Sequence, residues 1–189
     1  MTTWRSRGHR GDSSENEIDL TNDLYRRKKL AYIKKNPVPI KVIDIDSKGM
    51  ITKAYFEQKA CVDYSGIAQR ISIAFDVKET ELKSLPLSNI HAHQIQDLKE
   101  HAEQGGVSFV LAHFKIYNEY YLIPLEIIVY YYEKSLQGGR KSIPYGGLDK
   151  KFQIKRESNG IINYLPTINT YLNLKETLKE QYIAPRNAK

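Results

Sequence analysis

The chain contains few of the residues that would mark a secreted or membrane protein. It has one cysteine among 189 residues, which excludes an internal disulfide and is typical of a reducing compartment. We interpret Cys61 as a small packed residue rather than a nucleophile. No apolar run reaches the length of a membrane span, and the polar N-terminus has no signal-peptide core. These absences predict a cytoplasmic protein with no membrane partner.

The chain is rich in apolar residues and in positive charge. At 189 residues and 41% hydrophobic content it can bury the core of one domain. Its 29 lysines and arginines exceed its 22 acids, which gives a formal net charge of +7. A basic surface suggests a polyanionic partner such as nucleic acid, although composition alone identifies none.

The most informative stretch joins residues 61–66 to the segment 71–79. Apolar side chains alternate along the second segment, which predicts a strand with one core face. Asp76 and Lys78 share the opposite face, and Asp63 precedes a glycine-containing turn into the strand. If the two segments pair, both acids and the lysine meet at one place.

Two carboxylates and a lysine form a constellation suited to divalent-metal hydrolysis. The acids hold a hard cation through oxygen, and the lysine orients water or stabilises developing negative charge. The acid–lysine spacing is weak by itself, because 27% of the chain is charged. A solvated strand face is the alternative.

The first helix is predicted to begin at Ser13 or Ser14 and to continue to a break at residues 36–39. Ser14 and Glu17 have capping-box spacing, and the apolar stripe steps through Ile18, Tyr25 and Tyr32. Glu15 lies on that stripe. It is either an acid favoured by the helix dipole or an acid near the metal site.

Strand patterns at 40–45 and 50–56 flank a turn at 46–49 and predict a β-hairpin, with an ordinary sheet meander as the alternative. A second helix is predicted from Ser88 or Asn89 to Glu103, with Gln94 facing inward. Gln94 is either a supporting amide at the site or an amide bonded to backbone. His91 and His93 lack the partners of a zinc site. Strands are expected at 107–114 and 121–123, a loop at 138–144 and a short final element at 164–172. Pro124 suits the first turn of a helix through Glu133, although the β-branched and tyrosine residues that follow favour a strand.

Several spaced motifs occur in one order along the chain: Arg10-Gly11, Pro37-Val38-Pro39-Ile40, Asp63-Tyr64-Ser65-Gly66, Asp76-Val77-Lys78-Glu79-Thr80, His91-Ala92-His93-Gln94 and Gly139-Arg140-Lys141-Ser142-Ile143. Together they resemble the RecU-type Holliday-junction resolvases of the PD-(D/E)xK nuclease superfamily. The resemblance covers about residues 10–172, and the ordered set is far more specific than any one motif.

The resemblance implies an α/β fold: a restriction-endonuclease-like mixed sheet flanked by helices, with an inserted β-hairpin stalk at about residues 37–57. With it we divide the chain into a flexible basic N-terminal arm (1–12), a nuclease domain (13–172) and a C-terminal tail (173–189), for which a frayed helix is the alternative. It also implies a homodimer that resolves Holliday junctions by metal-dependent phosphodiester hydrolysis. Magnesium is the expected cofactor, with manganese as the alternative. Recombinase or branch-migration proteins are further candidate partners, in a bacterial cytoplasm or from a phage.

Site residues follow from the resemblance. Asp63, Asp76 and the Val77 carbonyl would hold the metal, and Lys78 would be catalytic. Glu15 and Gln94 would be a supporting acid and a supporting amide. The candidate DNA-binding cations are Arg10, Arg26, Arg27, Lys28, Lys35, Lys41, Lys48, Lys53, Arg140 and Lys141. Solvated charged surface is the alternative for these runs.

The sequence departs from the RecU-type pattern at four positions. Asp76 stands where glutamate is usual, so the metal must shift or the backbone must approach. His9 replaces an asparagine, and Thr167 and Asn169 replace an arginine and an aspartate. Two other functions therefore stay open: a nuclease of the same superfamily acting on forks or duplex ends, and a non-catalytic DNA-binding recombination accessory protein.

Overall fold

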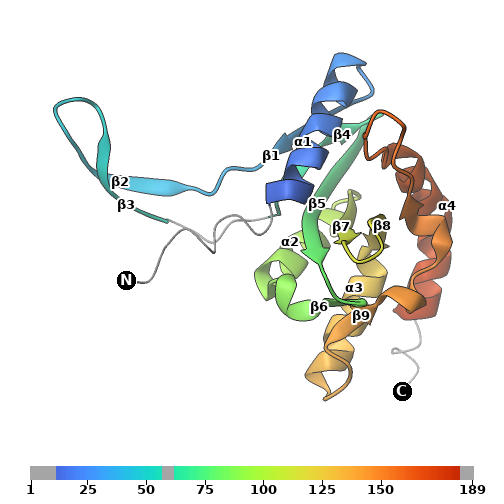
Figure 1. Cartoon of the computed structure of the whole chain (residues 1–189). Coiled ribbons are helices and arrows are strands. Elements are labelled where there is room, and N and C mark those ends of the chain that lie inside the picture. Colours follow the sequence, from blue (N-terminus) through green and yellow to red (C-terminus); the bar gives the residue numbers. More distant parts are fainter. Residues whose placement is uncertain (1–11, 57–61, 184–189) are drawn as a thin grey trace.

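The computed structural model describes residues 12–56 and 62–183 (Figure 1). Six strands form one sheet in the order β1-β4-β5-β7-β8-β10. The pair β5–β7 is parallel and the other pairs are antiparallel, so the sheet is mixed. The helices and strands that build this body are α1 (Asp12–Arg27), β1 (Ala31–Lys35), β4 (Tyr64–Ala68), β5 (Ile71–Thr80), α2 (Ala92–Glu103), β7 (Val107–Phe114), β8 (Glu119–Pro124), α3 (Leu125–Leu136), β10 (Gln153–Ile154) and α4 (Leu165–Tyr182).

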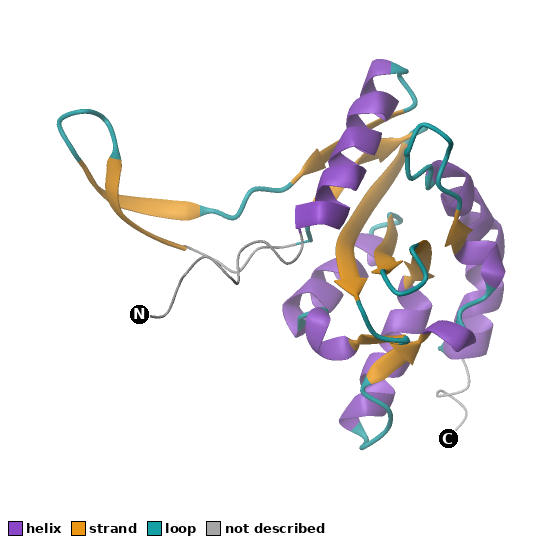
Figure 2. Cartoon of the chain, in the orientation of Figure 1, coloured by secondary structure: helices purple, strands orange, loops and turns teal. Residues whose placement is uncertain are grey.

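The helices pack around this sheet (Figure 2). Helix α1 contacts β1 and β5, α2 contacts β5 and β7, and both α3 and α4 contact β8. Strand β7 is buried along its whole length, as its nearly continuous apolar sequence predicts. Phe75 of β5 stacks between Tyr64 and Phe109, which ties three neighbouring strands together. The α/β class, with a mixed sheet flanked by helices, is confirmed.

The predicted hairpin is confirmed and forms a sheet of its own. Strands β2 (Ile40–Ile45) and β3 (Ile51–Phe56) pair antiparallel and extend away from the body (Figure 1). The Asp46 carboxylate accepts from the backbone N–H groups of Lys48 and Met50, and Gly49 takes a φ of 80°. The meander alternative is wrong, because these strands do not join the six-stranded sheet.

The predicted first helix is too long at its C-terminal end. Helix α1 ends at Arg27, Lys29 adopts a φ of 57°, and the chain continues as β1 paired with β4. Tyr32 therefore lies on an alternating strand and is 47% exposed, instead of continuing the buried stripe of Ile18 and Tyr25. Pairing with β4 satisfies the backbone of this segment and overrides its helical spacing.

The predicted capping box is also wrong. Helix α1 begins at Asp12, so Ser14 lies inside the first turn. Its hydroxyl donates to the Glu79 carboxylate at 2.7 Å, and Glu17 binds Tyr120 and Arg156. The two side chains therefore bind residues from distant parts of the chain, and do not form the reciprocal side-chain-to-backbone hydrogen bonds of a capping box.

Gly66 lies within β4 rather than in the turn that follows it. The turn consists of Gln69 and Arg70, both with positive φ. A Cβ at Gly66 would lie 2.1 Å from the Tyr32 carbonyl oxygen and 2.7 Å from the Ile33 Cα. Glycine is needed here because β1 packs against β4 at this point.

Two further regions differ from the expectations. The segment 138–144 is not all loop, since β9 (Ser142–Pro144) pairs with β6 (Ser84–Pro86). The body does not end at 172: α4 continues to Tyr182, with Leu178 buried, so residues 173–182 are not a tail. The boundary at 172 was taken from where the family motifs end, and those motifs do not show that an apolar residue such as Leu178 packs against the body. Residues 1–11 of the predicted arm and 184–189 lie outside the described residues. None of the described helices is long and apolar enough to cross a membrane.

Candidate active site

The register of β4 and β5 brings the two predicted metal-binding acids together. Tyr64 pairs with Phe75, so Asp63 lies beside Asp76 at the next position. The backbone N–H of Asp63 donates to Asp76 Oδ1 at 2.8 Å, and that of Val77 donates to Asp63 Oδ2 at 3.1 Å. Each carboxylate is thus oriented by an amide beside the other.

Lys78 completes the group from the same strand as Asp76. Its Nζ lies 3.1 Å from Asp63 Oδ2 and 3.7 Å from Asp76 Oδ2. The Asp76 side chain is fully buried, whereas those of Asp63 and Lys78 are 19% and 15% exposed. The three predicted residues therefore converge, and two of them reach solvent.

One oxygen of Asp76 lacks a hydrogen-bond partner. Its Oδ2 is buried and no described residue donates to it. Burial raises the pKa of the Asp76 carboxyl to about 6, against the lowering effect of Lys78 and with a contribution from the negative charge of Asp63. Such an oxygen beside a second carboxylate fits a divalent cation, which would supply the missing partner.

Few side chains near Asp63 and Asp76 could act as metal ligands. Among the described residues no three His, Cys, Asp or Glu side chains form a group that could enclose a metal. A set of only two carboxylates suits magnesium, which keeps several waters when it binds proteins. The Val77 carbonyl stays a predicted ligand, because no contact in the structure distinguishes it.

Glu15 lies on the strand side of α1 and pairs with Lys35. The Lys35 Nζ is 2.6 Å from Glu15 Oε2. The hydrogen bond to Glu15 raises the pKa of Lys35, and the charges of Asp19 and Asp63 raise it further. Lys35 thus lies between the helix acids and the predicted metal site. Tyr64 adds a second connection, since its hydroxyl donates to Asp19 at 2.8 Å.

Gln94 is buried in the first turn of α2, but the structure gives it a capping contact. Its Oε1 accepts from the backbone N–H of His91 at 3.2 Å. This is the backbone-bonded amide that was the alternative to a supporting role. The described contacts do not connect Gln94 to Asp63 or Lys78, and its role at the site stays a prediction.

The candidate DNA-binding cations are spread over three places. Lys41, Lys48 and Lys53 lie on the exposed hairpin, and Arg140 and Lys141 are exposed just before β9. A third group lies at the end of α1 and on β1: Arg26, Arg27, Lys28 and Lys35. Lys35 differs from the others, because its charge is paired with Glu15. Arg10 is outside the described residues.

The sequence pattern did not reveal the polar residues that surround α1. Glu79 binds Ser14 and also Lys115, whose Nζ is 2.7 Å from Glu79 Oε1. Glu17 binds Arg156 through both carboxylate oxygens. These partners are far apart in sequence, so no local spacing could have found them. Asp19 is the exception among these polar residues: it lies four residues after Glu15, and that spacing places both acids on one face of a helix.

A family model described as "Recombination protein U" (RecU) matches residues 9–170. The chain belongs to the RecU family. That range contains every predicted site residue, from Arg10 to Lys141, and excludes residues 171–182 of α4.

Curated relatives match most of the length of this chain. They include three proteins that are all named Holliday junction resolvase RecU. The protein of Lactococcus lactis subsp. lactis is 43% identical over 170 residues, 86% of this chain and 78% of the relative. Those of Oenococcus oeni and Geobacillus kaustophilus are each 36% identical, over 88% and 85% of this chain and 88% and 80% of the relatives.

A solved structure of Archaeoglobus fulgidus Hjc, titled a Holliday junction resolvase, aligns with a TM-score of 0.39 and 17% identity, covering 62% of this chain and 74% of that one.

Proposed function

We propose that this RecU-family chain is a structure-selective endonuclease that resolves Holliday junctions by magnesium-dependent phosphodiester hydrolysis. The observation that carries the proposal is the buried Oδ2 of Asp76 beside Asp63, which accepts no hydrogen bond from a described residue and has only a 3.7 Å ion-pair contact with Lys78. A closed structural ion pair would donate a hydrogen bond to that oxygen. A hydrolytic site leaves it for a cation, and the family membership supplies the substrate class.

The chain's own residues have distinct roles in this proposal. Asp63 and Asp76 hold the cation, which when bound activates water and neutralises phosphate charge. Lys78 would stabilise the negative charge that develops on a phosphate oxygen. Its ammonium group lies 3.1 Å from Asp63 Oδ2, which keeps it at the proposed metal site.

Junction selectivity belongs to the projecting hairpin. A four-way junction has an open centre lined by phosphates, which a linear duplex lacks. The hairpin carries Lys41, Lys48 and Lys53 and stands away from the active strand. Its shape fits the open centre and is excluded from duplex, so it discriminates without reading bases. A two-fold homodimer would supply the two matched cuts that resolution needs.

The test is incubation with a four-way junction and with a linear duplex of matched arm sequence, with and without magnesium. We expect paired cuts in the junction only with magnesium, and little cutting of the duplex. Cutting of duplex ends or forks at the same rate would favour a general nuclease. Tight junction binding without cutting in magnesium or manganese would favour a non-catalytic accessory protein.

A further inference from the structure

Helix α1 carries two rows of polar side chains that face different parts of the protein. Glu15 and Asp19 face β1 and β4, where they contact Lys35 and Tyr64. Glu17 and Thr21, also four residues apart, face the segment 156–162. Residues spaced this way lie on one helix face, so the two rows are fixed relative to each other. A contact that orients the second row therefore orients the first.

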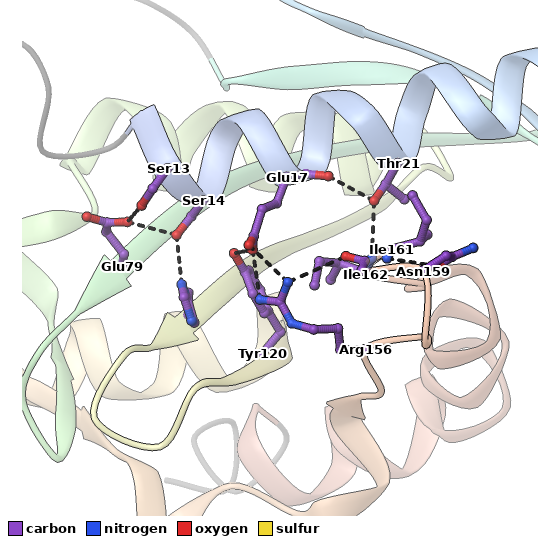
Figure 3. Close-up of polar contacts among 12 residues, drawn as sticks. Ser13, Ser14, Glu17, Thr21, Glu79, Tyr120, Arg156, Asn159, Ile161 and Ile162 are labelled. Atoms are coloured by element: carbon purple, nitrogen blue, oxygen red, sulfur yellow. Dashed lines mark hydrogen bonds and ion pairs between the residues drawn. The ribbon is translucent and has the colours of Figure 1, made fainter.

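Arg156 makes the strongest contact with the second row. Its Nη1 and Nη2 donate to Glu17 Oε1 and Oε2 at 2.9 and 3.0 Å, a bidentate pair (Figure 3). The Tyr120 hydroxyl donates to the same carboxylate at 2.6 Å, and the guanidinium lies 5.8 Å from the Tyr120 ring centroid. Burial would raise the pKa of Glu17, but the hydrogen bonds from Arg156 and Tyr120 outweigh it and lower the pKa.

The first turn of α1 is fixed to the active strand by a separate contact. Ser14 donates to Glu79 Oε2 at 2.7 Å (Figure 3). The Ser14 oxygen also lies 2.9 Å from His113 Nδ1. Glu79 follows Lys78 on β5. The helix turn that carries Glu15 is therefore held between Ser14 at one end and Glu17 at the other, beside the strand of the active site.

We infer that Arg156 is a positioning residue: through Glu17 it orients α1 so that Glu15 remains paired with Lys35, next to the candidate active site. The inference rests on the proposed nuclease function. Arg156 is suited to this role because both of its terminal nitrogens are directed at Glu17, and two-thirds of its side chain is covered. An arginine that bound phosphate would present those donors to solvent.

A double-mutant cycle tests the route through Glu15. We measure the single-turnover cutting rate of a four-way junction at saturating protein for the parent, Glu15→Gln, Arg156→Gln and the double variant. Each single change should slow cutting about tenfold. The double variant should be no slower than Glu15→Gln, because Arg156 has nothing left to position. A double variant about a hundredfold slower would overturn the inference, as would normal cutting by either single variant.

Two control variants separate positioning from stability and from charge. Tyr25→Phe removes hydrogen bonds that hold residues 163–165 to the other end of α1, so it should lower the melting temperature without slowing cutting. Lys155→Gln removes the neighbouring exposed cation and should leave the rate unchanged. Arg156→Lys, which cannot form the bidentate pair, should be intermediate. If Tyr25→Phe slows cutting as much as Arg156→Gln, general destabilisation explains both and the inference fails.

Hydrogen exchange provides a measurement independent of activity. In Arg156→Gln, the amides of residues 15–19 should exchange faster than in the parent, whereas those of β5 should not change. Unchanged exchange in α1 would overturn the inference, whatever the cutting rate. If the parent fails to cut junctions, the proposed function fails, and the exchange experiment still reports whether Arg156 orients the helix.

Discussion

The strand pairs β4–β5 and β2–β3 are both antiparallel hairpins with apolar residues on their strands, yet their surroundings are opposite. In β5 the run Ile73–Val77 is buried. In β2 and β3 every residue is exposed, including Ile43 at 54% and Phe56 at 72%. One pair lies at the centre of the sheet, and the other stands outside the body (Figure 1).

The difference in burial assigns different roles to the two strand pairs in our proposal: hydrolysis to β4–β5 and junction recognition to β2–β3. Burial and mutual contacts fix Asp63, Asp76 and Lys78 in one geometry, which would preorganise them for the proposed hydrolysis. The projecting hairpin contributes little to the core, since a two-stranded ribbon is marginal by itself. The hairpin exposes apolar side chains together with lysines, and exposed apolar surface of this kind marks interaction sites. Changes to the two pairs should therefore affect different measurements.

The largest effect is expected in the buried pair. Asp63→Asn or Lys78→Ala should slow junction cutting by at least about a hundredfold, because each removes a charge from the reacting centre. Junction affinity should be nearly unchanged, since phosphate contacts lie mostly elsewhere. Gel-shift and cleavage assays measure the two quantities, and Lys99→Ala on α2 is the control lysine variant. Near-normal cutting by both variants would refute the site assignment.

Replacing one glycine in each strand pair by alanine should affect the stability of the protein differently. Gly66→Ala should destabilise the body by about 1–3 kcal/mol, because the added Cβ meets the backbone of Tyr32. Gly49→Ala has open space but a φ of 80°, which costs about 1–2 kcal/mol locally. That cost stays within the hairpin, so the midpoint of denaturant unfolding should move only for Gly66→Ala. Equal shifts would show that hairpin and body unfold together.

Shortening the hairpin tests its role in selectivity. Replacing residues 43–51 with a short glycine-containing turn should leave the body folded and the site intact. Preference for the junction over linear duplex should fall at least tenfold, about 1.4 kcal/mol. Competition binding measures this preference, and duplex affinity is the internal control. If the shortened protein stays folded and prefers junctions as strongly as the parent, the hairpin is not the selectivity element.

The smallest effect concerns exposed cations near β9. If Arg140 and Lys141 neutralise phosphates on the duplex arms, reversing both charges should flatten the log–log dependence of junction affinity on salt. The slope should change by about 0.9 for each phosphate that the variant no longer neutralises. Lys150 and Lys151 form a matched neighbouring pair of exposed cations, whose reversal should change the slope less. An unchanged slope after reversal of Arg140 and Lys141 would make that pair ordinary solvated surface.

Much of the active centre could be predicted from the sequence, because it depends on local patterns. Alternation along 71–79 puts Asp76 and Lys78 on one face, and the short connection to Asp63 favours pairing of the two segments. The hairpin was predictable for the same reason, since two strand patterns flank a turn with Asp46 and Gly49. The order of motifs identified the family.

Other features depended on contacts between distant segments. Residues 31–35 fit a helical stripe but form β1, because β4 offers hydrogen bonds to their backbone. Ser14 and Glu17 have capping-box spacing, yet Ser14 donates a hydrogen bond to Glu79 and Glu17 accepts one from Arg156.

Local sequence patterns were enough to select the residues to which we assign the chemistry, because strand period and turn residues act over a few positions. Only the tertiary structure decided that β4–β5 is buried while β2–β3 stays exposed, since burial depends on what packs against a strand and not on its own alternation. It likewise decided that Arg156 lies against Glu17, 139 residues away in sequence, because a helix face and a distant loop meet only in the folded chain.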